Sequence, residues 1–269
     1  MAQYKGSGTT INAVNVYTQT PESPLGVTTL GARGGRFIGS YEDLTSGCRF
    51  VYATPTEQPQ IWAEFLLGAL ESYARYGVES VLEYDKVRDG STTAMFTAAL
   101  DRSGRVVGGM RAQGRYVSPV QAHAVAEWAG QPGEALLWGD IEDRLPAGVI
   151  EMKSGWVNER TPMRRELTSA LARVVPHSMR LLQARYALCT VAEHAVRRWE
   201  TTGARASSMI PAVAYPDDRY RTVPMWWDAE AVERLSTPEH WVALDTEWAE
   251  LRPVRPAHIR ANSGERAAA

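Results

Sequence analysis

The pattern of apolar and polar positions predicts strands and helices that alternate along most of the chain. Residues 48–54 (CRFVYAT) alternate as a half-buried strand does. A helix should follow, with Thr54 near its start and Gly77 at its end, because apolar residues recur there at helical spacing: Ile61, Phe65, Leu66, Ala69 and Tyr73. Two β-rich runs, 92–101 and 105–112, are joined by Arg-Ser-Gly and predict a hairpin.

The second half of the chain continues this alternation. Residues 148–157 (GVIEMKSGWV) predict a strand, and Thr161 is expected to cap a helix with Pro162 at its first position. Its apolar face is Leu167, Ala170, Leu171 and Val174, and Pro176 is expected to break or kink it. A strand at 185–191 and a helix ending at Gly203 come next, and two strands near 210–214 and 222–227 close the pattern.

This order of elements predicts an α/β protein with a mixed sheet and helices packed on it. Residues 46–250 form the expected domain, with helical pieces around 123–129 inside an insertion at 118–148. Residues 1–45 are rich in Gly, Thr and Ser and are predicted as an N-terminal extension, with a short hairpin at 27–40. Residues 251–269 are predicted as a flexible C-terminal tail.

Composition excludes several classes of function. The net charge of −2 argues against a nucleic-acid-binding protein, although 26 of the 29 basic residues are arginine, which suits carboxylate and phosphate recognition as well as a GC-rich genome. The two cysteines are far apart, so neither a zinc site nor a disulfide framework is expected. The N-terminus has no signal pattern and no apolar run reaches membrane-spanning length, which predicts a cytoplasmic protein with no membrane partner.

Three stretches resemble the GNAT superfamily of N-acetyltransferases. LDRSGRVVGGMRA (100–112) is similar to its central hairpin, YALCTVAEHAVRRWETTGA (186–204) to its fifth strand and fourth helix, and AYPDDRYRTVPMWWD (214–228) to its closing strands. The length of the chain, its insertion and its extended third helix look most like those of the N-acyl amino acid synthases and autoinducer synthases. The resemblance covers residues 49–228 and implies a GNAT-like acyltransferase fold.

The resemblance also implies an activity. Such an enzyme moves an acyl group from a CoA or acyl-carrier-protein thioester to the amine of an amino acid or a similar small metabolite. It holds no permanently bound cofactor and no metal, since acyl-CoA or acyl-phosphopantetheine is a substrate. The alternative is a non-catalytic GNAT-like module that binds an acyl donor or metabolite. The oligomeric state is not predicted.

The chain departs from the family at the donor site. Where the family has a glycine-containing pyrophosphate loop, this chain reads RTPMRREL from Arg160. Backbone amides at that helix N-terminus, with Arg160, Arg164 and Arg165, could still bind phosphate. A carrier-protein donor, which brings a single phosphate, is the other reading. Trp199 stands at the position of the family's general-acid tyrosine, so that role is expected elsewhere.

The family places a general base and an oxyanion site on the fourth strand. Glu151 is the predicted base that deprotonates the amine, and the alternative is a carboxylate that points outward or pairs with Lys153. Gly155, Trp156 and Val157 fall where backbone amides meet the thioester carbonyl, although the Trp156 side chain also suits core packing.

The stretch from Ala214 to Asp228 is predicted to form a pocket wall, with an aromatic sheet edge as the alternative. Tyr215 and Tyr220 can donate protons, and Arg219 and Arg221 can bind an acceptor carboxylate. Trp226 and Trp227 should face opposite sides of the sheet, with Trp226 predicted on the acceptor side. The remaining candidate groups are expected to be structural or surface residues: His123, His177, Cys189, Glu193 and His194.

Overall fold

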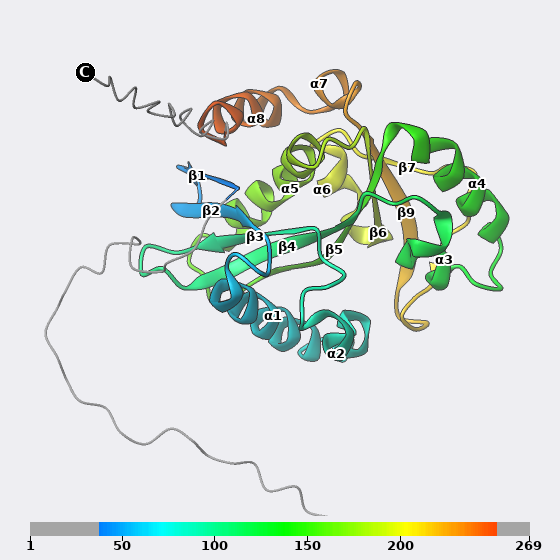
Figure 1. Ribbon diagram of the computed structural model, residues 1–269, viewed down its shortest axis with the longest axis horizontal. Coiled ribbons are helices and arrows are strands. Elements are labelled where there is room, and N and C mark those ends of the chain that lie inside the picture. Colours follow the sequence, from blue (N-terminus) through cyan, green and yellow to red (C-terminus); the bar gives the residue numbers. More distant parts are fainter. Residues whose placement is uncertain (1–37, 252–269) are drawn as a thin grey trace, which may run out of the picture. The chain divides into compact units, whose positions relative to one another are not determined.

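A mixed nine-stranded sheet forms the centre of the protein, which the computed structural model describes for residues 38–251 (Figure 1). The sheet order is β1-β2-β3-β4-β5-β6-β9-β7, and β8 pairs with β9. The strands are β1 (Gly39–Asp43), β2 (Cys48–Ala53), β3 (Met95–Leu100), β4 (Val106–Gly114), β5 (Val149–Val157), β6 (Tyr186–Ala192), β7 (Arg205–Ala206), β8 (Val213–Ala214) and β9 (Arg221–Asp228). The predicted mixed sheet is therefore confirmed.

The feature of the sheet that matters most is the parting of its two parallel strands. β5 pairs with β6 only from Val149 to Glu151, opposite Tyr186 to Leu188. Beyond this point β5 continues along β4, while β6 continues along β9 up to the Ala192–Thr222 pair. The strands of the hairpin, of Glu151 and of Cys189 thus share one sheet, and the last two separate towards their C-terminal ends.

A bulge in β5 lies next to this parting. The register with β4 steps from Arg111–Lys153 to Gly109–Trp156, so Ser154 and Gly155 together face the single residue Met110. Ser154 has a φ of 54°, in the left-handed region. A bulge bends its strand and interrupts regular ladder pairing. It turns β5 at the level where β6 has already separated.

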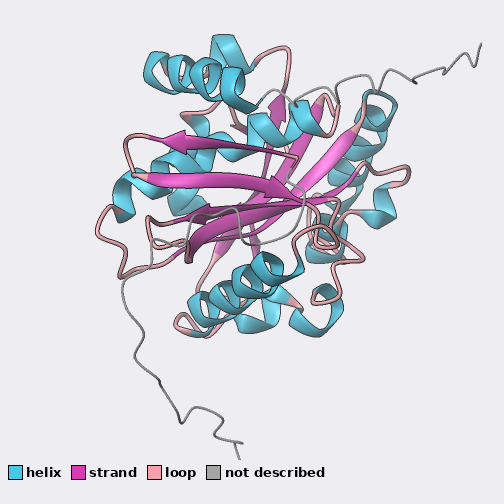
Figure 2. Cartoon of the chain, turned by 60° about the vertical axis from the view of Figure 1, so that its left-hand side comes forward, coloured by secondary structure: helices cyan, strands magenta, loops and turns pink. Residues whose placement is uncertain are grey.

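Two long helices cover opposite faces of the sheet. In Figure 1, α1 (Pro59–Ala74) lies below β3 to β5 and α5 (Arg164–Leu181) lies above them, and Figure 2 also shows helices on both sides. The buried faces match the predicted periodicity, with Phe65 and Leu66 in α1 and Leu167 and Val174 in α5. The shorter helices are α2 (Tyr84–Val87), α3 (His123–Glu127), α4 (Glu134–Arg144), α6 (Val196–Glu200), α7 (Val232–Leu235) and α8 (Pro238–Leu251).

The two long helices begin later than predicted. α1 begins after Gln58, because the Thr54 hydroxyl accepts the Glu57 amide in a turn instead of capping the helix. α5 begins at Arg164 with Met163 as its cap, so the predicted start at Thr161 was wrong. Of the two effects predicted for Pro176, a break or a kink, the break does not occur, because the helix runs on to Leu181. Packing of the buried face on the sheet outweighs the loss of one backbone N–H at the proline.

The ends of the predicted domain differ slightly from the elements observed. β1 falls inside the predicted extension of residues 1–45, and it pairs with β2 along its whole length. The predictions for residues 1–37 and 252–269, including most of the hairpin at 27–40, lie outside the described residues. No helix in the described part of the chain is long and apolar enough to cross a bilayer.

A buried ionic network fastens α8 to the sheet and to α5. The Arg173 guanidinium donates to Asp43 of β1 at 2.7 Å and to Glu247 of α8 at 2.7 Å. The other oxygen of Glu247 lies 2.8 Å from His177 Nε2, and burial lowers the pKa of His177. All four side chains are at least nine-tenths buried. The structural role expected for His177 agrees with this position.

Removing the Glu247 charge should destabilise the fold, because Arg173 then keeps only one of its two buried partners. We expect Glu247→Gln to lower the free energy of unfolding by about 3 kcal/mol, the scale for breaking a buried ion pair. Urea denaturation measures this change. Asp245→Asn, the same chemical change on an exposed residue of α8, is the control. Equal losses in the two variants would contradict a stabilising role for the network.

Candidate active site

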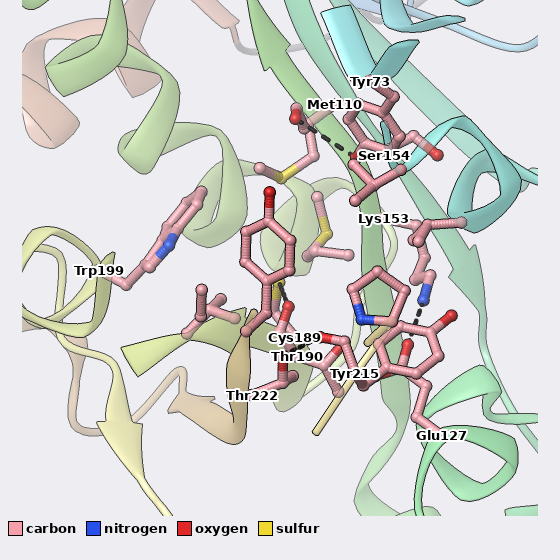
Figure 3. Close-up of a pocket in the computed structure, with 18 residues that line it drawn as sticks. Tyr73, Met110, Glu127, Lys153, Ser154, Cys189, Thr190, Trp199, Tyr215 and Thr222 are labelled. Atoms are coloured by element: carbon pink, nitrogen blue, oxygen red, sulfur yellow. Dashed lines mark hydrogen bonds and ion pairs between the residues drawn. The ribbon is translucent and has the colours of Figure 1, made fainter. Parts of the chain in front are cut away.

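A pocket of about 240 Å³ opens where β5 and β6 separate (Figure 3). β5 and β6 supply two of its walls, α1 supplies Tyr73, and the loop before β9 supplies Tyr215 and Tyr220. In Figure 3, Trp199 of α6 lies on one side of the pocket, and Glu127 and Lys153 lie on the other. The remaining lining is Val78, Val81, Met110, Met152, Ser154, Gly155, Cys189, Thr190, Val191, Ala192, Pro216 and Thr222.

Glu127 and Lys153 form a buried ion pair at one end of this pocket. Lys153 Nζ donates to Glu127 Oε1 at 2.9 Å, and the side chains are 8% and 1% exposed. Burial alone would raise the pKa of Glu127, but the Lys153 ammonium and the His123 contact hold it at about 2. Burial alone would lower the pKa of Lys153, but Glu127 and Glu151 raise it. Both groups are therefore ionised throughout the physiological pH range.

His123 completes the charged cluster. Its Nδ1 lies 2.7 Å from Lys153 Nζ and 2.7 Å from Glu127 Oε1, and its Nε2 lies 3.4 Å from Glu83 Oε2. Nδ1 therefore lies between a donor, the Lys153 ammonium, and an acceptor, Glu127 Oε1, and the tautomer of the ring decides which of the two it bonds. His123, Glu127 and Glu151 have the spacing of metal ligands, and the Lys153 ammonium contacts all three, with Glu151 at 3.8 Å.

One oxygen of Glu127 has no hydrogen-bond partner in the protein. Glu127 Oε2 is buried and has no hydrogen-bond partner, and Glu127 is the one carboxylate among the described residues that line the pocket. An unpartnered buried charge is costly. Sequence reasoning missed Glu127, and the available signal was its spacing of four residues from His123 on a predicted helical piece.

Glu151 has a different position from the one its predicted role requires. Its carboxylate is fully buried and accepts the amide N–H groups of His123 at 2.7 Å and Ala124 at 3.0 Å and the hydroxyl of Tyr116 at 2.8 Å. It does not line the pocket. Glu151 therefore anchors the first turn of α3, and Glu127 follows one turn later. Its role as general base stays a prediction.

The two predicted tyrosines do line the pocket. Burial, and then the charge of Glu127, raise the pKa of Tyr215 to about 12. Burial likewise raises the pKa of Tyr73 to about 12, and its hydroxyl lies 3.5 Å from the Gly155 carbonyl oxygen. Tyr215 and Tyr73 are therefore neutral hydrogen-bond donors at pH 7.

The predicted acceptor-binding residues lie away from the pocket. Arg219 pairs with Asp217 at 2.7 Å and donates to the carbonyl oxygens of Tyr76 and Gly77, so it fastens the loop to the end of α1. Arg221 is exposed and lies 3.3 Å from Glu193. Trp226 is buried in a second core cluster with the Arg144 guanidinium 4.6 Å from its ring.

Trp226 and Trp227 face opposite sides of the sheet, as predicted. Trp227 packs in the main core, edge-on to Trp199, whereas Trp226 belongs to the cluster under α3 and α4. Neither ring lines the pocket. The part of this stretch that lines the pocket is therefore Tyr215, Pro216, Tyr220 and Thr222.

The predicted oxyanion residues divide between two cavities. Gly155 lines the central pocket, whereas Trp156 and Val157 line a neighbouring cavity beside α1. The Trp156 ring packs so closely on α1 that a Cβ at Gly68 would lie 2.1 Å from it, which supports the core-packing reading of this side chain. From Met152 onward, no described strand pairs with the β6-facing edge of β5.

A separate basic cavity of about 410 Å³ lies at the start of α5. Arg164 and Arg165 of α5 line it together with Arg198 of α6, and Thr168, Ser169, Thr201 and His240 complete the lining. Arg198 is the neighbour of Trp199, so α6 contributes to both cavities. Arg160 lines neither and has its amide bonded to Asn158.

The other candidate groups have local roles. Cys189 lines the pocket, but burial raises its pKa to about 12, so its thiol is a poor nucleophile. Glu193 makes the exposed pair with Arg221 already described. The structural reading of Cys189 stands.

Comparison with known proteins gives relatives of unassigned function and solved structures of similar fold. The chain is 44% identical over 192 residues to the uncharacterized proteins Rv1356c of Mycobacterium tuberculosis and Mb1391c of Mycobacterium bovis, which covers 71% of this chain and 73% of theirs. No family model matches.

Solved structures resemble the chain in their arrangement of elements. FeeM, an N-acyl amino acid synthase from uncultured soil microbes, is 11% identical over 70% of this chain and 96% of its own, with a TM-score of 0.46. BjaI, a CoA-dependent acyl-homoserine lactone synthase, is 14% identical over 72% and 86%, with a TM-score of 0.48. These likenesses say nothing about substrates in this chain.

The strand order, the parting of β5 from β6 and the bulge beside it make up a GNAT fold. The fold class implied by the resemblance in the sequence is thereby confirmed.

If Glu151 anchors α3, its replacement should act first on stability. In Glu151→Gln, an amide group faces three hydrogen-bond donors, so we expect a loss of about 2 kcal/mol and a melting temperature lower by about 4–8 °C. Differential scanning fluorimetry measures it, with the exposed Glu142→Gln as control. An unchanged melting temperature combined with lost turnover would instead favour the general-base prediction.

Proposed function

We propose that this chain, which belongs to one family with the mycobacterial proteins Rv1356c and Mb1391c and has a GNAT fold, transfers an acyl group from a thioester to an amine. The observation that carries the proposal is the pocket between the parted strands. It holds hydrogen-bond donors, apolar walls and one buried carboxylate oxygen that no protein group satisfies.

The donor would lie along the α6 side of the pocket. Its phosphate groups suit the basic cavity, where Arg164, Arg165 and Arg198 surround the amino end of an 18-residue helix. A pantetheine arm leading past Trp199 would bring the thioester to Gly155 on the free edge of β5. One phosphate or two can be held in this way, so CoA and a carrier protein are both compatible donors.

The acceptor would lie on the opposite side, at Glu127. An ammonium group would bind its free oxygen, lose a proton to solvent through the open pocket, and attack the thioester carbon as a neutral amine. The attacking nitrogen then gives up a second proton, the carbon–sulfur bond breaks, and the leaving thiolate takes up a proton, so the products are the amide and the free thiol. Because the pKa of Glu127 is about 2, this carboxylate orients the amine and is a weak base.

The remaining roles follow from position. The backbone amide of Gly155, the predicted oxyanion residue that lines this pocket, would stabilise the oxyanion of the tetrahedral intermediate. Tyr215 and Tyr220 line the same pocket. Their hydroxyl groups would donate the proton that other members of the family take from a tyrosine at the position of Trp199. Glu151 would act as a positioning residue, since it holds the helix that carries Glu127.

The second candidate is a module that binds an acyl donor without transferring its acyl group. Trp199, which replaces the family's proton-donating tyrosine, favours it. Incubation of the protein with acyl-CoA and amines separates the two, because only an enzyme releases free thiol beyond the rate of hydrolysis. Donor binding without thiol release, across acyl chains and amines, would support the module.

Arg164 and Arg165 provide the sharpest test of donor placement. We expect the double variant Arg164→Ala, Arg165→Ala to weaken CoA binding by about tenfold or more at low salt, and by less at high salt, because the lost contacts are ionic. Isothermal titration calorimetry measures the affinity. The matched control is Arg160→Ala, which removes a neighbouring charge outside both cavities. Equal affinity in the double variant and the control would contradict this placement.

A further inference from the structure

Acyl transfer requires only that the acceptor carries an amine, but the charges around the pocket also limit which other charged groups the acceptor can carry. We propose that the acceptor is a primary amine with an apolar or aromatic body and without a carboxylate, and that amino acids are excluded. This inference rests on the proposed acyl transfer and concerns the same pocket.

Of the two charged side chains that line the pocket, the one with an unpartnered atom is negative. Glu127 and Lys153 are the acidic and basic side chains among the described lining residues. Glu127 Oε2 is buried, without a partner, on a side chain only 1% exposed. A charge-assisted bond from an ammonium group satisfies such an oxygen, whereas an anion placed there would be repelled.

Lys153 is not available to an acceptor carboxylate. Its ammonium donates to Glu127 at 2.9 Å, lies 2.7 Å from His123 Nδ1 and lies 3.8 Å from Glu151. Two carboxylates already surround this one cation, and the side chain is 8% exposed. A third carboxylate would have to displace one of these partners in a buried setting, which leaves a charge unpaired.

The arginines that could bind a carboxylate are committed elsewhere. Arg219 pairs with Asp217 and Arg221 with Glu193, and neither lines the pocket. Arg111 lies behind the bulge and donates to Ser154 and Thr93, and it does not line the pocket either. Within residues 38–251, no lining group is left to neutralise an acceptor anion.

The walls indicate the body of the acceptor. Tyr215 lies next to the charged end, with its ring centre 6.2 Å from that of His123, and the rest of the lining includes Tyr220, Val78, Val81, Met110 and Met152. Such walls suit an alkyl or aryl group, which they remove from water. An arylalkylamine or an alkylamine meets both requirements, since its cation faces Glu127 and its hydrocarbon faces the walls.

Matched acceptors that differ only at the carboxylate test the inference. Phenethylamine, phenylalaninamide and phenylalanine share the ring and the amine, and the amide keeps the bulk of the carboxylate without its charge. Tyramine and tyrosine give a second pair. The wild-type protein is assayed with acetyl-CoA and octanoyl-CoA, and kcat/KM is obtained from free thiol release.

We expect phenethylamine and phenylalaninamide to be used at least tenfold better than phenylalanine, and tyramine at least tenfold better than tyrosine. Equal or better use of the amino acids would overturn the inference while leaving acyl transfer intact. Donor binding without thiol release from any acceptor would overturn acyl transfer itself, and the inference with it.

Variants of Glu127 test whether this residue causes the preference for amines without a carboxylate. Glu127→Gln should reduce the ratio between phenethylamine and phenylalanine several-fold, mainly through a higher KM for the amine. Glu127→Asp keeps the charge and should retain the preference. A ratio unchanged in a folded Glu127→Gln protein would contradict the assigned role of Glu127, and the wild-type panel decides the acceptor class independently of either variant.

Discussion

The separation of two parallel strands is the constraint on which the rest of the structure depends. β5 and β6 share only three register pairs, after which each follows its other neighbour. Backbone groups on the free edge of β5 would be costly in a closed core. The bulge at Ser154 and Gly155 lies at the same level, and the aromatic loop before β9 and helix α6 complete the surrounding pocket.

The charged end of the pocket depends on a support that the substrate would not touch. Glu151 binds two amides at the start of α3 and so fixes the helix from which Glu127 projects. Lys153, two residues along β5, then neutralises Glu127 from the other side. One strand therefore supplies both the anchor and the counter-ion, and the insertion supplies the carboxylate left with a free oxygen.

Much of the fold could be predicted from the sequence, because apolar periodicity and turn residues report local structure. The hairpin, β5, β6 and the buried faces of α1 and α5 follow directly from such patterns. The residues of the candidate site were harder to predict from the sequence. Arg219 and Arg221 resemble an anion clamp in the sequence, yet their partners Asp217 and Glu193 are set by the folded loop. Glu127 enters the pocket only because Glu151, distant in sequence, holds its helix there.

The central claim is that the parted strands receive a thioester donor. A crystal structure with a non-hydrolysable thioether analogue of acyl-CoA tests it most directly. The account predicts the sulfur between Gly155 of β5 and Val191 of β6, with phosphate groups against Arg164, Arg165 and Arg198. An analogue that binds elsewhere and leaves the pocket between β5 and β6 unoccupied would contradict the account.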